Sequence, residues 1–426
     1  MSIDRTTAPE FHTIGSIDIP RAERVKLSAG NDLWLLDAGT QDVLRLDFIF
    51  NAGSRFQQKT LVASGVNEML DEGTAQRSAE EIAEELDYFG AFIESEPGKD
   101  TSSFTVFTMN RHLEPVMKIV SEILCGASFP ENEFRVYIDN KKQKFIVDSD
   151  KVSVLARRKF GEIIFGEKNP YGAAVKLTDF DAIGRKDLDA FHKTFYAKEN
   201  CTIVASGKIP QGLEALLEKY PAGNPGKKAA ADDFAPFSPS AERIHTVEKA
   251  GAIQSAIRMG RPLFNKTHPD YHAMLVLNTV LGGYFGSRLM SNIREDKGYT
   301  YGIGSGIMSM YNAGYFVIST EVGAEVTNAA LEEIYSEIAR LQNDLIPEEE
   351  LELVRNYMTG VFLRSTDGPF ALGDRLKGLL GYGLGYDYYE RYLETIRSVS
   401  ANELRELAQK YLRKEDIFEL VAGVRK

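Results

Sequence analysis

The fold is decided by two stretches of the chain that repeat each other. The first reads IGRKDLDAFHKTFYAKENCTIVASG, from Ile183 to Gly207, and the second reads VSANELRELAQKYLRKEDIFELVAG, from Val399 to Gly423. Adding 216 to each number of the first stretch gives the second without a gap. Each stretch predicts a helix, a short charged turn and a strand. The apolar positions that match are Leu188 with Leu404, Phe191 with Leu407, Phe195 with Tyr411, and Val204 with Leu420. The chain is therefore predicted to be a tandem duplicate.

A linker separates the two copies. Residues 221–242 contain four prolines, small residues and charges, with no apolar periodicity, which is typical of a connecting segment. We therefore predict an N-terminal α+β domain at 1–220, a linker at 221–242 and a C-terminal α+β domain at 243–426.

The pattern within the first copy mixes strands and helices. Leu44, Leu46, Phe48 and Phe50 alternate with other residues and predict one buried face of a strand. Ser78 and Glu81 form the signature of a capping box before a helical apolar stripe. The predicted fold class is α+β, with helices packed on one face of a mainly antiparallel sheet in each copy.

Composition narrows the range of functions. The 426 residues carry 62 acidic and 50 basic side chains, a formal net charge of -12. This excess of negative charge disfavours nucleic acid or an anionic membrane as the main partner. No apolar run is long enough to span a membrane, and the first residues lack the pattern of a signal peptide. The two cysteines, Cys125 and Cys201, make no disulfide framework and are expected to be small buried residues. We therefore expect a cytoplasmic protein.

Several segments resemble the insulinase/pitrilysin family of zinc peptidases and their mitochondrial processing peptidase relatives. The matching pieces of the first copy are AGSR at 52–55, EGT at 72–74, FGA at 89–91 and NPYG at 169–172. The most specific segment is LNTVLGGYFGSRLMSNIREDKGYTYGIGS, at 277–305. The resemblance covers nearly the whole chain, and it implies a duplicated fold shaped like half a clam-shell.

The zinc motif of that family is absent. Its enzymes carry His-x-x-Glu-His before the EGT-like turn, where the histidines bind zinc and the Glu activates water. The aligned histidine and Glu positions hold Ser64, Asn67 and Glu68, and no histidine occurs between His12 and His112. The resemblance places the third ligand at about Lys144, a cation that would repel zinc. We expect no metal in this chain.

Two other motifs have the composition of possible sites. His268 and His272 have the spacing of two ligands on one helix face, but Pro269 lies between them, and a helix start on the surface, capped by Thr267, is the simpler interpretation. Gly381, Gly383 and Gly385 lack the preceding strand of a nucleotide-binding motif and are interpreted as a connection between helices.

The resemblance assigns a role to Arg294 and Tyr301. In the family's second half, an Arg and a Tyr at this spacing reach toward the substrate at the zinc. A guanidinium and a phenol can donate hydrogen bonds to a peptide carbonyl as it gains negative charge. An Arg bonded to a helix end and a Tyr packed in the sheet remain the structural alternative.

These observations predict a zinc-free, non-catalytic subunit of a heterodimeric peptidase. It would close the substrate chamber and supply Arg294 and Tyr301 to the zinc site of a homologous partner chain. Extended peptides would add as a strand to a sheet edge near residues 91–96. A peptide-binding or scaffold protein without proteolysis is the alternative, and an enzyme with relocated metal or other chemistry is a third class.

Overall fold

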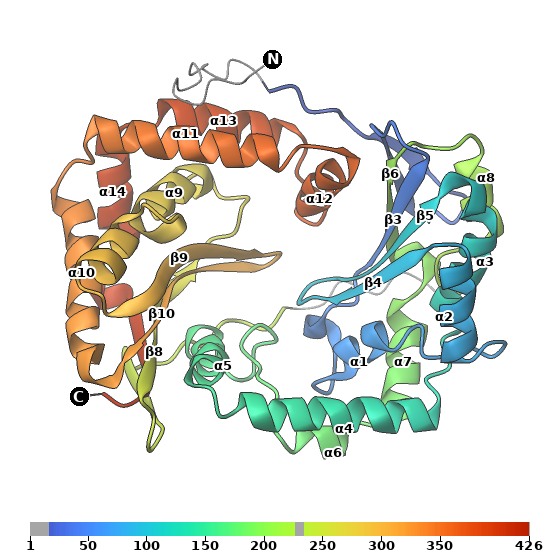
Figure 1. The fold of residues 1–426 in the computed structure, drawn as a ribbon, viewed down its shortest axis with the longest axis horizontal. Coiled ribbons are helices and arrows are strands. Elements are labelled where there is room, and N and C mark those ends of the chain that lie inside the picture. The colour runs from blue at the N-terminus through green and yellow to red at the C-terminus, as the bar shows by residue number, and fades with distance from the viewer. Residues whose placement is uncertain (1–16, 226–233, 426) are drawn as a thin grey trace, which may run out of the picture.

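The computed structural model describes residues 17–225 and 234–425. Residues 226–233 of the predicted linker and the N-terminal residues considered for a signal peptide lie outside the described residues. Figure 1 shows two sheets at opposite sides of the molecule, each with helices on its outer face. All strands of one sheet precede the predicted linker and all strands of the other follow it. The domain bounds themselves stay a prediction.

The two sheets have the same topology. The first runs β1 (Glu23–Lys26), β2 (Asp32–Asp37), β6 (Cys201–Gly207), β3 (Val43–Phe50), β5 (Ser102–Met109), β4 (Phe92–Pro97). The second runs β7 (Ile244–Glu248), β11 (Phe418–Gly423), β8 (Gln254–Leu263), β10 (Ala313–Gly323), β9 (Thr300–Met310). Only β2 with β6 and β7 with β11 pair in parallel, and the other neighbours are antiparallel. The second sheet thus repeats the first from β2 onward, and the predicted duplicated α+β fold is confirmed.

The repeated stretches form equivalent elements. The first gives α7 (Arg185–Phe195), a 3-10 turn (Lys198–Asn200) and β6, and the second gives α14 (Ala401–Tyr411), a 3-10 turn (Lys414–Asp416) and β11. The helices and turns differ by the predicted 216 residues at both ends. Each helix therefore contributes to the core of its own half, α7 through Leu188 and Phe191 and α14 through Leu404 and Ala408.

The predicted periodicities correspond to the buried faces of the first half. Leu44, Leu46, Phe48 and Phe50 of β3 are fully buried under the outer helices. Ser78 caps the next helix with both capping-box hydrogen bonds in place. The helices of this half are α1 (Val62–Glu68), α2 (Ala79–Tyr88), α3 (Leu113–Gly126), α4 (Glu131–Asp148), α5 (Val152–Phe165), α6 (Asp179–Ala182), α7, and α8 (Leu213–Lys219).

The second half has a corresponding core between its sheet and its outer helices. The helices of this half are α9 (Tyr271–Asn278), α10 (Thr327–Asn343), α11 (Glu348–Arg364), α12 (Pro369–Leu380), α13 (Asp387–Ser398) and α14. Gly381, Gly383 and Gly385 lie between α12 and α13, so their interpretation as a helix connection is confirmed. No helix in the described ranges has the length and hydropathy of a membrane span.

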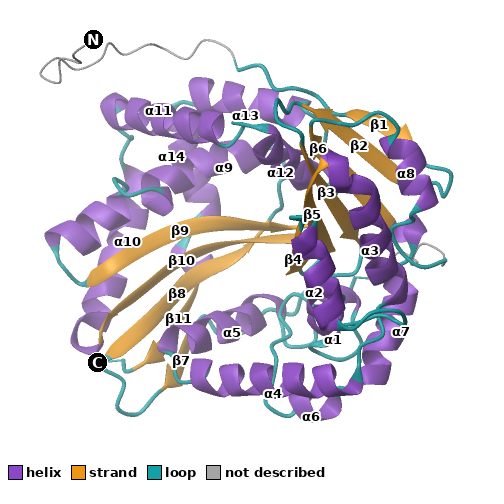
Figure 2. Cartoon of the chain, turned by 45° about the vertical axis from the view of Figure 1, so that its right-hand side comes forward, coloured by secondary structure: helices purple, strands orange, loops and turns teal. Residues whose placement is uncertain are grey.

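Two helices are exchanged between the halves. Helix α5 of the first half packs on the inner face of the second sheet, where Ala156 and Phe160 meet Phe418 and Leu420 of β11. Helix α12 of the second half packs on β6 and β2 of the first sheet. Figures 1 and 2 show both helices between the two sheets. Each sheet is thus covered on both faces, whereas the sequence predicts helices on one face only.

Charged residues anchor α12. Asp47 of β3 is fully buried and accepts hydrogen bonds from Arg45 at 2.8 Å and from Lys377 of α12 at 2.9 Å. Arg45 also donates to Asp374 of α12 at 2.7 Å. A buried carboxylate is stable only when such partners compensate its charge. The network therefore ties the second half to the first sheet.

Candidate functional site

The positions that replace the zinc motif lie on the short helix α1 and on α4. Ser64, Asn67 and Glu68 belong to α1, which is packed between α7 and the edge strand β4. Lys144 lies on α4, where it is exposed and shares one helix face with Tyr137 and Lys141. The structure thus brings the four sequence-predicted positions onto two neighbouring helices.

Glu68 is already engaged by α4. Its carboxylate accepts a hydrogen bond from the Tyr137 hydroxyl at 2.6 Å and forms an ion pair with Lys141 at 2.6 Å. Burial and the adjacent Glu68 carboxylate raise the pKa of Tyr137 far above its ordinary value, so this hydroxyl remains a donor. The one carboxylate of the site is therefore neutralised by an ammonium group.

The other two side chains also form local contacts. Ser64 donates to the carbonyl of Leu61 at 3.1 Å, and the buried Asn67 amide donates to the carbonyl of Ser103 at 3.1 Å. A hydroxyl, an amide and a carboxylate paired with a cation do not match the nitrogen, sulfur and free carboxylate ligands that zinc takes in proteins. Within residues 17–225 and 234–425, no group of three His, Cys, Asp or Glu side chains could hold a metal ion. The donor set of this site does not fit zinc.

Tyr137 and Lys141 were missed by the sequence analysis. A signal for them was present, because 137, 141 and 144 follow helical spacing and must share a face once Lys144 is placed near α1. Their contact with Glu68 could be recognised only after the two helices were placed side by side.

The structure brings Arg294 and Tyr301 together. Arg294 lies in the π-helical segment Met290–Asp296, and Tyr301 lies at the start of β9, the edge strand of the second sheet. The guanidinium carbon lies 5.2 Å from the Tyr301 ring centre and 4.7 Å from that of Phe285. These distances are in the range of cation–π contacts. Phe285 was not singled out from the sequence.

This cluster is open to solvent. Tyr301 is 91% exposed and Phe285 is 61% exposed. Among the described residues, neither the Arg294 guanidinium nor the Tyr301 hydroxyl has a hydrogen bond or ion pair within the chain. The structural alternative for the pair, a helix-end bond and a packed Tyr, is thus not what the structure shows.

The two histidines in HPDYH do not form a site. His268 stacks on Phe264 at 3.9 Å between ring centres, whereas His272 is buried beside Tyr388 at 4.4 Å. Helix α9 begins at Tyr271 with Asp270 as its N-cap. The expected cap at Thr267 and the expected surface position of His272 are therefore wrong. The aromatic residues of α13 cover the start of α9, and local sequence does not report that packing.

The cysteine prediction holds only for one of the two. Cys201 is buried at the start of β6, and Cys125 is half-buried at the end of α3. Both are free thiols.

The predicted peptide-binding segment is an edge strand. Residues 92–97 form β4, which pairs with β5 on one side and is the last strand of the first sheet. Strands at a sheet edge offer unpaired backbone groups to an added strand.

Comparison with known proteins agrees with this architecture. A family model described as the peptidase M16 inactive domain matches residues 182–358. The uncharacterized zinc protease YmxG of Bacillus subtilis is 25% identical over 344 residues, which cover 77% of this chain and 82% of that protein. An uncharacterized zinc protease of Mycobacterium leprae is 23% identical, covering 85% and 83% of the two chains.

Solved structures show the same fold. A peptidase M16 inactive domain from Pseudomonas fluorescens superposes with a TM-score of 0.88 at 24% identity, covering 95% of this chain and 99% of that one. A protease from Helicobacter pylori superposes with a TM-score of 0.83 at 18% identity, covering 95% and 100%. Fold and site together describe a protein of the peptidase fold whose zinc-motif positions do not offer zinc ligands. The chain is similar to the peptidase M16 family in sequence over residues 182–358 and in fold over nearly its whole length.

Proposed function

We propose that this chain is the zinc-free subunit of a heterodimeric peptidase of this family. It closes the substrate chamber over a homologous chain that carries the zinc, and it contributes Arg294 and Tyr301 to that partner's site. Both chains act in the cytoplasm, where free thiols such as Cys125 and Cys201 persist.

The observation that carries the proposal is the exposed cluster of Arg294, Tyr301 and Phe285. Placing a guanidinium between two solvent-exposed aromatic rings holds it in position without using its hydrogen-bond donors. Those donors and the Tyr301 hydroxyl remain free for a group outside the chain. A peptide carbonyl under attack at a zinc ion gains negative charge, and two positioned donors lower the energy of that state.

The replaced zinc positions support the same division of labour. Glu68 is bound to Tyr137 and Lys141, so hydrolysis needs a metal from another chain. The edge strand β4 provides a place where a substrate can be held extended, because its outer edge has no neighbouring strand among the described residues.

The test is to combine the chain with a homologue that carries His-x-x-Glu-His and to measure peptide hydrolysis. Activity is expected to require both chains. Removing one donor to a developing oxyanion typically lowers kcat by about 100-fold or more, so Arg294→Ala and Tyr301→Phe should each reduce kcat by about that factor. Tyr88→Phe and Arg364→Ala change exposed residues of the same types elsewhere and should leave kcat unaltered.

Assembly is measured separately by sedimentation, so that a loss of activity is not confused with a loss of pairing. Full turnover in the Arg294 and Tyr301 variants of an assembled pair would refute the assigned role. A chain that binds peptides but enhances no homologue's activity would favour the scaffold alternative.

A further inference from the structure

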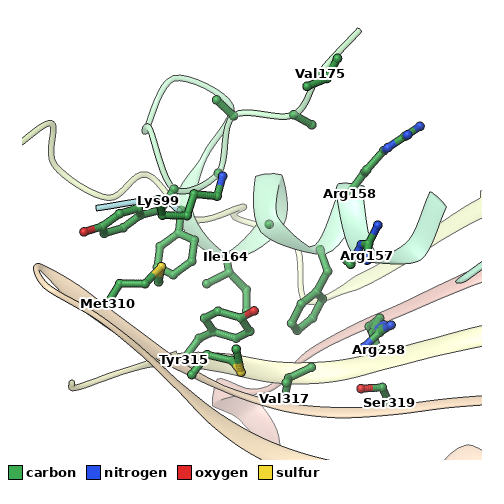
Figure 3. A pocket seen from close by; sticks show the side chains of 18 of the residues that line it. Lys99, Arg157, Arg158, Ile164, Val175, Arg258, Met310, Tyr315, Val317 and Ser319 are labelled. Atoms are coloured by element: carbon green, nitrogen blue, oxygen red, sulfur yellow. The ribbon is translucent and has the colours of Figure 1, made fainter. Parts of the chain in front are cut away.

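A pocket of about 970 Å³ lies between helix α5 and the inner face of the second sheet. Figure 3 shows α5 above the pocket and the strands β8 and β10 below it. Lys99, in the turn that follows β4, also lines it. The pocket is therefore adjacent to the end of the edge strand that we propose for substrate binding.

The lining of this pocket is strongly basic, although the chain as a whole has a net charge of -12. The only acidic side chain among the described lining residues is Asp148, and its carboxylate is paired with Lys151 at 2.8 Å. The basic lining residues are Lys99, Lys141, Lys144, Arg157, Arg158 and Arg258. Such an uneven distribution of charge gives the pocket a positive potential.

Arg157 of α5 and Arg258 of β8 are, like Lys99 and Lys144, cations of this lining without a carboxylate partner in the described parts of the chain, and they face each other across the pocket from the helix and the sheet. Among the described residues, neither guanidinium has a hydrogen bond or an ion pair to a carboxylate. Figure 3 shows Arg157 on the helix side of the pocket and Arg258 on the sheet side. Burial, and to a smaller degree the charge of Arg157, lower the pKa of Arg258, while Tyr315 and Glu321 oppose that change. Two like charges that line one pocket, with Arg258 half-buried, favour an anion between them.

Arg158 differs from this pair because it is already in contact with its own half. It donates to Ser149 at 2.8 Å and lies over the Phe145 ring at 4.0 Å. It therefore contributes charge to the pocket but has less freedom to move toward a ligand.

Beside the two arginines, the wall becomes apolar. Phe160 of α5 and Tyr315 of β10 meet edge to face at 6.5 Å, and Ile164 and Met310 continue this surface. A ligand for this pocket must therefore carry an anionic group next to an apolar one.

We propose that this pocket binds the carboxylate of a peptide between Arg157 and Arg258, with a neighbouring apolar side chain against Phe160 and Tyr315. The inference rests on the proposed role in holding peptides, and it defines their class as acidic with an apolar neighbour. Guanidinium groups suit this role because they bind carboxylates through two parallel hydrogen bonds. The carboxylate is either an acidic side chain or the end of the main chain.

The test uses the isolated chain and four fluorescent octapeptides of otherwise equal sequence. Each has one Glu or one Gln between two Leu residues, and each has either a free or an amidated C-terminus. Binding is followed by fluorescence anisotropy at two salt concentrations, because an exposed ion pair weakens with salt. The peptide with Glu and a free C-terminus should bind at least about tenfold more tightly than the one with neither carboxylate.

The intermediate peptides identify the source of the carboxylate. If exchange of Glu for Gln lowers the affinity, the bound carboxylate is the acidic side chain. If amidation lowers the affinity, the bound carboxylate is the C-terminus. Equal affinity for all four peptides would overturn the proposal.

Variants test the site itself. Arg157→Gln, at an exposed helix position where folding should be unaffected, and Arg258→Gln should each weaken binding by about tenfold. Arg364→Gln, outside the pocket, should not change it. Unchanged affinity in Arg157→Gln would also overturn the proposal. Because no partner chain is present, this result is separate from the outcome for Arg294 and Tyr301.

Discussion

Removing the Asp47 side chain should weaken the attachment of α12 to the first sheet. The Asp47 carboxylate is fully buried and accepts hydrogen bonds from Arg45, Thr105 and Lys377 at 2.7–3.1 Å. Breaking a buried ion pair costs roughly 3–5 kcal/mol because a charge is left without its partner. Here Asp374 still lies 2.7 Å from Arg45 and 3.0 Å from Lys377. We therefore expect Asp47→Ala to lower the free energy of unfolding by about 3 kcal/mol, the lower end of that range.

Asp374→Ala is the matched control, because Asp374 contacts the same two cations but its side chain is 57% exposed. Exposed ion pairs contribute roughly 0–1 kcal/mol, so this variant should be far less destabilised. If one half of the chain unfolds as a unit of about 200 residues, its unfolding entropy is about 0.4 kcal/mol/K. The expected decrease in Tm is then about 7 °C for Asp47→Ala and about 2 °C or less for Asp374→Ala.

Calorimetry measures both shifts, and urea unfolding followed by circular dichroism gives the free energies at 25 °C. Equal shifts in the two variants would refute the reasoning, because the carboxylates share Arg45 and Lys377 and differ in burial and in the hydrogen bond from Thr105 that only Asp47 accepts. A single transition of the whole chain would reduce both shifts by about half without changing their ratio.

Stability should also depend on the pH between 6.5 and 4, because burial lowers the pKa of both His192 and His272 to about 4. As the pH falls below 6.5, the unfolded chain takes up protons that the folded chain does not, so each histidine should reduce the free energy of unfolding by about 2 kcal/mol at pH 5. Urea titrations at pH 7 and pH 5 measure this loss of stability. The same loss in His192→Gln as in the unaltered chain would contradict the prediction. Gly381→Ala should be strongly destabilising, because a Cβ there would lie within the Tyr311 side chain, 1.7 Å from its hydroxyl oxygen. Gly378→Ala is the control, because the atom nearest to a Cβ there is a lysine nitrogen at 4.0 Å, and this variant should be neutral or slightly stabilising. Thermal unfolding compares the two variants, and similar Tm values would refute the steric argument.

The fold class could be predicted because its signals are local. The 216-residue repeat, the alternation from Leu44 to Phe50 and the capping box at Ser78 each reflect the geometry of one element. The sequence also predicts the replacement of zinc ligands at Ser64 and Glu68, since the ability to bind zinc depends first on residue type.

The sequence by itself thus determined that this is a duplicated α+β protein, and it contains no His-x-x-Glu-His motif. Only the tertiary structure decided that α5 and α12 cross between the halves, that Lys141 neutralises Glu68, and that Arg157 and Arg258 line one pocket. The physical reason is that an apolar period shows which face of an element is buried but not which element covers it. Contacts between residues far apart in the chain arise from packing of whole elements, so their chemistry appears only when the fold is complete.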